Sequence, residues 1–490
     1  MSKKESNTNA QRLLIGSILI ACTLYLGYFV QQDDFWQFLP VFVVFFGLYS
    51  WIITRPTLDL KGRKLQFWIG LAILLRFVLL FGIPNLSDDV YRFIWDGRLI
   101  QNGINPFTQL PTYYIEQTTP PAGINLALFQ QLNSPNYYTI YPPVAQFTFF
   151  VATWLFPESI WGSAFVMKLF LFAFECGNIF LLLRLLPLFG VAQRNTLIYT
   201  LNPLIIVEIS GNLHFEGAMI FFLLLSLFLL LKSKTALVPQ HSISSDNDGR
   251  TLHSIRPDIS THSFRLFSTS SLNRYFLLSA LAFALAIASK LLPVLFLPLF
   301  IKRLGWKKSI LYFAIIGLTT LGLFTPLISG VFLQNFGESL DLYFRKFEFN
   351  ASFYYVARWL GFQLKGFNLI AKLGPALAMM TFVSVLALSF TSTNKSMKRL
   401  PVLMLFAISI YLSFTTTVHP WYVSLPLVLC CFSTFRYPVL WSGLILLTYI
   451  NYSYSIYQEN LWIVGVEYVL VWLYFLWESL TKGKLIKNGK

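Results

Sequence analysis

Two adjacent carboxylates, Asp88 and Asp89, follow an apolar run in the first fifth of the chain. A single acid in such a place is usually a solvated loop charge. Adjacent carboxylates can raise one another's pKa or share a cation, and a carboxylate at a membrane surface can act as a general base toward a sugar hydroxyl. Because Tyr91, Arg92 and Trp95 follow directly, we interpret the pair as a candidate catalytic site.

The residues after this pair have helical spacing. Asp89, Arg92, Asp96 and Leu99 are separated by three or four positions, which predicts a short amphipathic helix along the membrane surface. Asn102-Gly103 is a typical end for such a helix. We expect the apolar side chains of the helix to rest on the lipid interface, and these are Ile94, Trp95, Leu99 and Ile100.

A second group of ionisable residues lies inside apolar sequence. Glu208, His214 and Glu216 occur in one run together with Asn212, and Lys290 occurs in another run shortly before a proline. An ionisable group at membrane depth costs several kcal/mol unless it is paired or wet, so such residues are functional candidates. The alternatives are a hydrogen-bonded core histidine and a lysine whose ammonium group reaches the membrane surface. If Lys290 is functional, a phosphate is the ligand it could bind.

Two further stretches could contact a sugar. Tyr141-Pro142-Pro143 predicts an extended entry into the next helix. His419 and Trp421 open a later apolar run. Aromatic rings in such a place either belong to an interfacial belt or stack on a sugar, and the sequence leaves both interpretations open.

The composition requires lipid as part of the solvent. Of the 490 residues, 56% are hydrophobic and 12% are charged, and the mean hydropathy is +0.62. A soluble protein carries roughly a quarter charged residues. Although the net charge is +16, the basic residues occur in short runs between apolar segments, which is typical of cytoplasmic membrane loops. We therefore expect a multi-pass protein of the cell membrane, with membrane lipid and not nucleic acid as a partner.

The apolar runs divide the chain into five parts. Residues 1–84 hold the N-terminal transmembrane helices, 85–142 form an outer catalytic loop, and 143–232 continue the transmembrane bundle. Residues 233–274 are a flexible polar linker, and 275–490 hold the C-terminal transmembrane helices. We predict an all-α polytopic membrane protein of about 12–14 transmembrane helices, with surface helices in its long first outer loop.

The basic clusters orient the bundle. They place the termini in the cytoplasm and the 85–142 loop on the outer face. Between residues 143 and 301 two arrangements fit. In the first, 143–160 crosses the membrane only in part and 275–301 is a hairpin bent at Lys290 and Pro293. In the second, 275–301 is one long span and the section before it is reversed; charge favours the first.

Together these stretches resemble the GT-C superfamily of membrane glycosyltransferases. The first loop is similar to that of bacterial polyprenyl-phosphate-mannose-dependent mannosyltransferases, which reads two acids, Tyr, an aromatic residue, Trp-Asp-Gly-Arg, then Gly-x-Asn-Pro and another aromatic residue. The matching residues are Asp88, Asp89, Tyr91, Phe93, Trp95, Asp96, Gly97, Arg98, Gly103, Asn105, Pro106 and Phe107. The stretch from Asn202-Pro203 to His214 and Glu216 resembles the superfamily's Asn-Pro and Gly-Gly-His-Asn-Asp segment. Glu216 replaces the Asp, and one extra residue precedes His214.

The resemblance implies a GT-C-like bundle that moves a sugar, expected to be mannose, from a polyprenyl-phosphate donor to a lipid-linked or envelope glycan acceptor. Transfer would take place at the outer face and invert the anomeric centre. Asp88 or Asp89 would be the general base, and His214 and Lys290 would hold the phosphate. The substrate-binding candidates are Tyr91, Arg92, Asp96, Arg98, Asn105, Tyr141, His214, Glu216, Lys290, His419 and Trp421.

No cofactor or metal site is expected, because the leaving phosphate monoester carries less charge than a nucleotide diphosphate. The paired aspartates leave a divalent cation open. The main alternative is a transporter or flippase of lipid-linked sugars, for which inverted repeats and charged groups at mid-depth are expected. The sequence has broken helices but no evident repeat, and its best group of charges lies in an outer loop.

A lipid-linked polysaccharide ligase or polymerase is the other alternative. Such an enzyme is expected to have its large outer loop late in the chain, whereas the large loop here is early. The acceptor, the identity of the sugar, the linkage and the oligomeric state stay open at this point.

Overall fold

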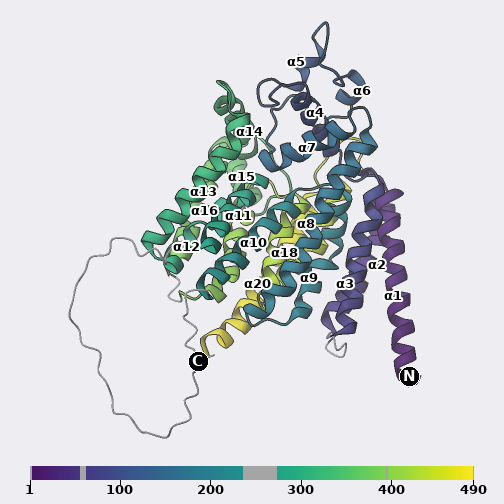
Figure 1. Ribbon diagram of the computed structural model, residues 1–490, viewed down its shortest axis with the longest axis vertical. Helices are drawn as coiled ribbons and strands as arrows, with labels where there is room; N and C mark the ends of the chain where they lie inside the picture. The colour runs from purple at the N-terminus through teal and green to yellow at the C-terminus, as the bar shows by residue number, and fades with distance from the viewer. Residues whose placement is uncertain (1–2, 56–61, 236–272, 392–394, 489–490) are drawn as a thin grey trace, which may run out of the picture.

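The computed structural model describes residues 3–55, 62–235, 273–391 and 395–488, and the regular secondary structure in these ranges is helical apart from one isolated β-bridge between Phe349 and Thr417 (Figure 1). Within them, nine helices, some with an adjoining 3₁₀ turn, are long and apolar enough to cross a membrane. The predicted all-α polytopic class is confirmed. The nine helices are α1 (Lys3–Tyr28), α2 (Phe35–Thr54), α3 (Arg63–Val78), α8 (Ile160–Leu188), α10 (Glu216–Thr235), α13 (Trp306–Phe324), α16 (Ile370–Thr391), α17 (Leu400–Phe414) and α20 (Leu461–Asn488).

Several other apolar runs fold as two short helices in series, which is why fewer long helices are found than the 12–14 predicted spans. Asn202-Pro203 and Pro298 interrupt two of these runs, because proline removes a backbone donor and clashes with the preceding turn. The paired segments are α9 (Thr196–Thr200) with the π-helical turn η3 (Ile205–Gly211), η5 (Leu292–Phe296) with α12 (Pro298–Leu304), η8 (Pro420–Val423) with α18 (Ser424–Cys430), and α19 (Tyr437–Leu444) with η9 (Ile445–Tyr452).

The long helices have one face toward the protein and another toward lipid. In α2, residues Phe35, Phe38, Phe42 and Phe45 are buried at the three- and four-residue spacing of one helix face, while Val43 on another face is exposed. Exposed apolar side chains also occur along α13, α16 and α20. In water such a surface would aggregate, whereas lipid solvates it.

The two ends of the bundle differ. Both termini lie at one end, which we call the terminal end, and the first loop lies at the opposite end, which we call the loop end (Figure 1). Short helices build this loop end. They are α4 (Asp89–Gln101), α5 (Pro111–Ile115), α6 (Leu126–Phe129), α7 (Pro143–Leu155), α14 (Phe332–Arg345) and α15 (Phe353–Lys365).

The structure decides between the two predicted arrangements of residues 143–301. Helix α7 has 13 residues, too short for a full crossing, and lies at the loop end (Figure 1). Helix α11 (Arg274–Ser289) ends at Lys290, whose backbone is extended, and η5 with Pro293 then leads back. The hairpin bent at Lys290 and Pro293 is therefore confirmed, and the single long span is wrong because the helix breaks there.

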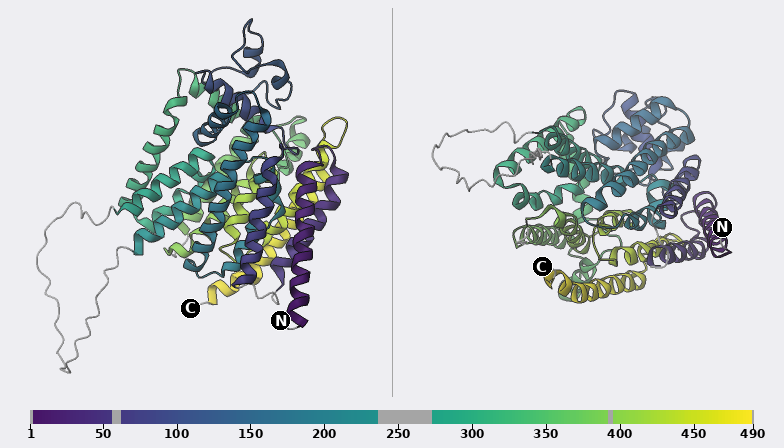
Figure 2. Two further views of the ribbon diagram at one scale, coloured as in Figure 1. Left: turned by 45° about the vertical axis from the view of Figure 1, so that its right-hand side comes forward. Right: turned by 60° about the horizontal axis from the view of Figure 1, so that its bottom comes forward.

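The described flanks of the predicted linker 233–274 are helical: α10 continues to Thr235 and α11 begins at Arg274. The rest of that prediction lies outside the described residues. Helices α10 and α11 pack against each other. Parts of the chain that are far apart in the sequence also meet in the bundle, since α2 contacts η9 (Figure 2).

The first loop has a hydrophobic core of its own. Its helix α4 packs against α7, and the rings of Phe93, Phe149 and Phe215 meet in this core. The predicted helix and its end at Asn102 are confirmed. The expectation that its apolar face rests on lipid is wrong for Ile94, Trp95 and Leu99, which are buried because α7 and the remainder of the loop cover that face; Ile100 is partly exposed.

Candidate active site

The two adjacent carboxylates lie at the start of α4. Asp88 is the residue that precedes the helix and Asp89 is its first residue, a position where the helix dipole favours negative charge. Asn133, from the far side of the same loop, donates from Nδ2 to Asp88 Oδ1 (2.7 Å) and to Asp89 Oδ1 (2.8 Å). One amide therefore holds both carboxylates in a fixed arrangement.

The neighbours of the two carboxylates make them unequal. Burial and the negative charge of Asp89 raise the pKa of Asp88, against the hydrogen bond from Asn133. Burial also favours a higher pKa for Asp89, but His214, Asn133 and the charge of Lys290 outweigh it and lower that pKa to about 2. Asp88 is thus the better proton acceptor at neutral pH, and Asp89 is the more firmly ionised partner.

His214 reaches Asp89 from the bundle. Its Nε2 lies 3.7 Å from Asp89 Oδ2, which is an ion-pair distance and too long for a hydrogen bond. The helix breaks at Asn202-Pro203, and the π-helical turn η3 that follows brings the histidine to the site. The side chain of His214 is almost fully buried, so it approaches the Asp89 carboxylate from the protein interior and not from the cavity.

Lys290 stands at the bend between α11 and η5. Its Nζ lies 3.1 Å from Glu216 Oε1, with Glu216 fully buried at the start of α10, and 5.8 Å from the centre of the Tyr141 ring. Tyr141 is placed by the extended Pro142 before α7, as predicted. Three of the predicted substrate-binding candidates, Tyr141, Glu216 and Lys290, therefore lie together, and Glu216 forms an ion pair with the lysine.

Two cavities meet at Lys290. The first, of about 390 Å³, contains the carboxylates. The predicted site residues that line it are Asp88, Asp89, Arg92, Tyr141, Lys290, His419 and Trp421. The second, of about 510 Å³, shares Ile140, Tyr141, Lys290 and Tyr422 with the first but is otherwise lined mainly by apolar residues of η5, α16 and α17. A polar chamber with carboxylates thus opens beside a long apolar one.

The predicted aromatic group at His419 forms one wall of the polar cavity. The Trp421 ring stacks with His419 (centroids 4.5 Å apart) and with His214 (3.6 Å), and His419 stacks with Phe349 (4.8 Å). Trp421 therefore links both histidines. Its ring is engaged by imidazoles, which leaves less of its surface for a sugar than an isolated belt residue would have.

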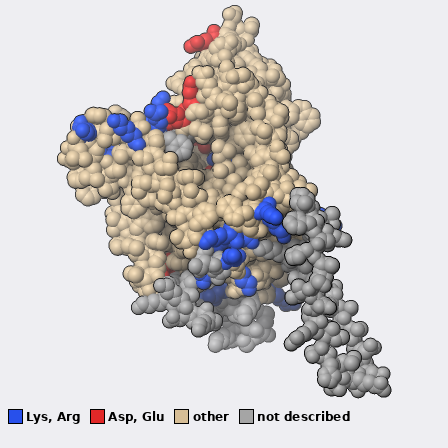
Figure 3. All heavy atoms as spheres, turned by 90° about the vertical axis from the view of Figure 1, so that its left-hand side faces the viewer, with Lys and Arg blue, Asp and Glu red and all other residues tan. Residues whose placement is uncertain are grey.

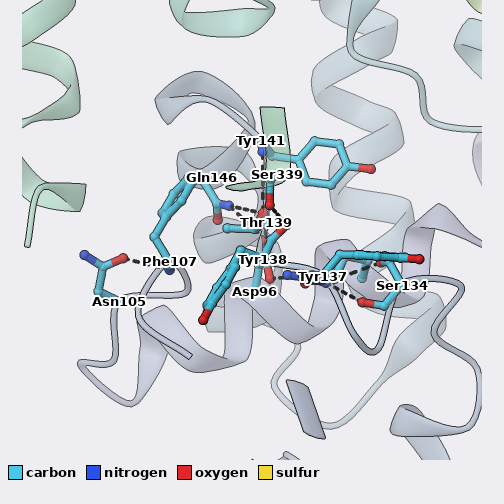
Figure 4. Close-up of polar contacts among 11 residues, drawn as sticks. Asp96, Asn105, Phe107, Ser134, Tyr137, Tyr138, Thr139, Tyr141, Gln146 and Ser339 are labelled. Atoms are coloured by element: carbon cyan, nitrogen blue, oxygen red, sulfur yellow. Dashed lines mark hydrogen bonds and ion pairs between the residues drawn. The ribbon is translucent and has the colours of Figure 1, made fainter. Parts of the chain in front are cut away.

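Arg92 and Asp96 hold the loop together. Asp96 is fully buried and accepts hydrogen bonds from Arg92 Nε (3.0 Å), Thr139 Oγ1 (2.5 Å) and Gln146 Nε2 (2.9 Å), the last two of which are seen in Figure 4. Arg92 also donates to the carbonyl groups of Ser134 and Tyr137. Asp96 therefore holds the loop in shape but does not line the cavity. Arg92 holds the loop and also lines the cavity.

Three other predicted residues lie away from the polar cavity. Arg98 donates to the Gly123 carbonyl (2.7 Å) and Asn105 donates to the Leu327 carbonyl (2.6 Å). Tyr91 packs against the loop core. Asn105 thereby fastens the first loop to the turn that follows α13. Asn335 fastens the same loop to α14 by donating to the Phe107 carbonyl (2.8 Å).

Sequence reasoning did not select Asn133, because an asparagine 44 residues beyond Asp89 has no local signal. It also left Glu208 and Tyr449 without a role, although Glu208 is fully buried and its Oε1 accepts from Tyr449 (2.8 Å). The position of Glu208 in an apolar run was the signal available. Within the described ranges, no three His, Cys, Asp or Glu side chains are placed to hold a metal ion.

The chain is thus a helical membrane bundle in which a polar cavity with two carboxylates adjoins an apolar cavity. Residues 23–304, which run from within α1 to the end of α12 and include Asp88, Asp89, His214 and Lys290, match the MptA_B family, described as alpha-(1->6)-mannopyranosyltransferase, N-terminal domain. The chain belongs to this family and is accordingly a glycosyltransferase of a mannosyltransferase family. A comparison with curated proteins gives no match.

Proposed function

We propose that the protein transfers mannose from a polyprenyl-phosphate donor to a glycan or glycolipid acceptor at the outer face of the membrane, with inversion. The observation that carries this proposal is the meeting of the two cavities at Lys290. A polyprenyl-phosphate sugar has three parts, an apolar chain, a phosphate and a sugar. The apolar cavity, the lysine and the carboxylate cavity follow in the same order.

The apolar cavity suits a polyprenyl chain. Its lining residues on α16 run from Gly374 to Val385, a distance of about 16 Å along a helix axis. The opposite wall comes from Leu292, Leu295 and Pro298. A branched hydrocarbon chain buried there would gain roughly 25 cal/mol per Å² of covered apolar surface.

The phosphate would lie at the junction. Lys290 is partly exposed and lines both cavities, so its ammonium can stabilise charge that develops on the leaving phosphate. The imidazole of His214 is the next basic group, although it is screened from the cavity by Asp89 and Trp421. We assign the phosphate to Lys290 first and treat His214 as a group that acts on Asp89.

The proposed reaction is a single displacement. The acceptor hydroxyl attacks the anomeric carbon, Asp88 accepts its proton, and the bond from that carbon to the phosphate oxygen breaks. The lipid phosphate leaves with the bonding electrons, and attack from the opposite face inverts the centre. Asp88 is the preferred base because its pKa is raised, whereas Asp89 is paired with His214. No step uses a metal ion.

The distribution of basic residues supports an outer location for the candidate site. Basic residues flank the helices at the terminal end, among them Arg63, Lys64, Lys307, Lys308 and Lys398, as expected for cytoplasmic ends. Figure 3 shows the face that is on the left-hand side in Figure 1. One cluster of basic side chains lies low on that face, and a second lies beside acidic side chains nearer the loop end. The loop end is thus mixed in charge, and the terminal end is basic.

The test is sugar transfer by membranes that contain wild type, Asp88→Asn or Asp89→Asn at equal abundance. Radiolabelled polyprenyl-phosphate mannose is the donor, and native lipid extract is the acceptor pool. We expect labelled glycolipid with wild type and a loss of about 10²- to 10⁴-fold with Asp88→Asn, since that is the usual contribution of a general base. Asp341→Asn, an exposed acid of α14, is the matched control and should transfer normally.

Full transfer by Asp88→Asn would contradict the assignment of the base. Absence of transfer by wild type with mannose, but transfer with another polyprenyl-phosphate sugar, would contradict the sugar. Chelation of divalent cations is expected to leave the rate unchanged. A rate that falls on chelation and returns with Mg²⁺ would place a cation on the carboxylate pair.

A further inference from the structure

Glu208 is a fully buried carboxylate next to the site that the proposed reaction does not use. It belongs to η3 and is held by two donors, Tyr449 OH to Oε1 (2.8 Å) and Asn212 Nδ2 to Oε2 (3.2 Å). Its Oε2 also lies 3.4 Å from Nδ1 of His214. A buried carboxylate kept in one rotamer beside an imidazole indicates a specific role.

The backbone around Glu208 is shaped to aim His214. η3 is a π-helical turn, a rare form that is frequent at functional sites. Leu213 has a φ of 65°, which is unfavourable for a buried residue with a branched side chain. As a result the Glu208 carbonyl accepts from both the backbone N (3.3 Å) and Nδ1 (2.8 Å) of His214.

Both ring nitrogens of His214 therefore lie near oxygens that can only accept a hydrogen bond. Nδ1 is hydrogen-bonded to the Glu208 carbonyl and lies 3.4 Å from the Glu208 carboxylate, and Nε2 lies 3.7 Å from Asp89 Oδ2. A neutral imidazole with its proton on Nδ1 would turn a lone pair toward the Asp89 carboxylate, which is repulsive. A ring with both nitrogens protonated is attracted on both sides, and the face of Trp421 stacked on it also favours a cation.

The charged groups around His214 come from several elements. Asp89 belongs to α4, Glu208 to η3 and Glu216 to α10, whereas Lys290 follows α11 and His419 precedes η8. Burial lowers the pKa of His214, but Asp89, Glu208 and Glu216 together outweigh burial and raise it. Glu208 is the member of this group with no other cation beside it among the described residues.

We propose that Glu208 is a positioning residue, which fixes His214 as an imidazolium aimed at Asp89. In this way it keeps Asp89 ionised and engaged, so that Asp88 is the carboxylate free to accept a proton. The effect on catalysis rests on the proposed function. The charge and orientation of His214 do not, and they can be measured without any substrate.

The experiment is a pH titration of His214 by solid-state NMR on full-length protein in lipid bilayers, labelled with nitrogen-15 only at histidine. The chain has five histidines, and the His214 signals are assigned by their loss in His214→Asn. In wild type we expect more than half of His214 to be doubly protonated at pH 6.5, the ordinary midpoint of a histidine.

In Glu208→Gln the side-chain amide oxygen can still accept from one of the two donors, Tyr449 or Asn212, but the negative charge is gone. A histidine whose pKa is raised by a carboxylate keeps its proton below that pKa and loses it as the pH rises. The His214 midpoint should therefore move to lower pH in Glu208→Gln and stay near wild type in Glu208→Asp. Glu467→Gln, another fully buried carboxylate hydrogen-bonded to Trp441 and Asn350, is the control and should leave the midpoint unchanged.

A neutral His214 in wild type at pH 6.5 would overturn the proposal without any variant. An unchanged midpoint in Glu208→Gln would overturn it as well. Mannose transfer is measured on the same samples as a separate readout. If wild type shows the expected titration but no transfer, the proposed function fails and the role of Glu208 in setting the charge of His214 stands.

Discussion

Asn133 hydrogen-bonds both carboxylates of the candidate site, and its amide reaches them from 45 and 44 residues further along the chain. Its hydrogen bonds favour the ionised forms, while burial and mutual repulsion disfavour that of Asp88. At the scale of single residues, Asp88 and Asp89 are chemically identical, and their different partners give them different pKa values and different roles.

This balance predicts a pH effect for Asn133→Ala. The hydrogen bond from Asn133 lowers the pKa of Asp88, so its removal raises that pKa. A base with a higher pKa is protonated up to a higher pH, and the decline of the transfer rate on the acid side should begin at a higher pH than in wild type. Rates of sugar transfer measured between pH 4 and 8 test this directly.

Asn136→Ala is the matched control, since Asn136 is an exposed residue of the same loop. Its acid-side decline should coincide with that of wild type. A decline that moves to lower pH in Asn133→Ala would mean that the amide does not stabilise the ionised carboxylate that takes the proton.

The carboxylate pair could be found in the sequence because its two members are adjacent and follow an apolar run. His214, Glu216 and Lys290 could be selected because charge is rare in such runs. Asn133 and Tyr449 could not, since their role arises from contacts across 44 and 241 residues. Asp96, Arg98 and Asn105 share the loop motif, yet the fold directs their side chains to hydrogen bonds that hold the loop.

At the scale of elements, the close approach of α4 to α7 places the carboxylates. A Cβ on Gly97 would lie 2.5 Å from the Phe149 carbonyl oxygen and 2.8 Å from Thr153 Oγ1. Gly97→Ala must therefore push the helices apart, and we expect a loss of about 1–3 kcal/mol of stability, the usual cost of overpacking. Thermal unfolding of purified protein in detergent measures this.

Gly70→Ala is the control for that substitution, because nothing lies within 4 Å of a Cβ at Gly70 of α3. Its midpoint should equal that of wild type or exceed it slightly, since alanine favours helix. Equal midpoints for Gly97→Ala and wild type would show that α4 can move without cost.

The wall that α16 gives to the apolar cavity allows a second prediction at this scale. Ala378 lines that cavity, whereas its neighbour Met379 is exposed on the outside of the helix. Ala378→Trp should fill the space for the polyprenyl chain and raise the KM for the lipid donor, while Met379→Trp should leave KM unchanged. Initial rates measured against donor concentration give the KM of each variant. Equal KM values for both variants would show that this cavity does not bind the polyprenyl chain.

Which apolar runs become helices was largely predictable, because about 20 apolar residues suffice for a span. The hairpin at Lys290 and Pro293 was among the alternatives, because a charged residue and a proline interrupt the apolar run there. The π-helical turn η3 was not, since it depends on how Glu208 and His214 pack against α4 and η9. The burial of the apolar face of α4 was missed because a sequence does not tell lipid from a covering helix.

At the scale of the whole molecule, the position of the site at one end requires a defined side of the membrane. The basic residues of the terminal end favour the cytoplasm for that end. Tyr113 in the first loop and Lys307 at the start of α13 are both exposed, and they lie near opposite ends of the bundle. A cysteine at each position therefore reports on one side.

We expect a membrane-impermeant maleimide to label Tyr113→Cys in intact cells, and to label Lys307→Cys only after the membrane is opened. Wild type is the control for its own thiols, of which Cys22, Cys430 and Cys431 are buried and Cys176 is partly buried. The reverse pattern would place the carboxylate cavity in the cytoplasm. An acceptor outside the cell would then be out of reach, because Asp88 would face the side on which nucleotide sugars are made, and the proposed use of a lipid-linked donor would lose its physical reason.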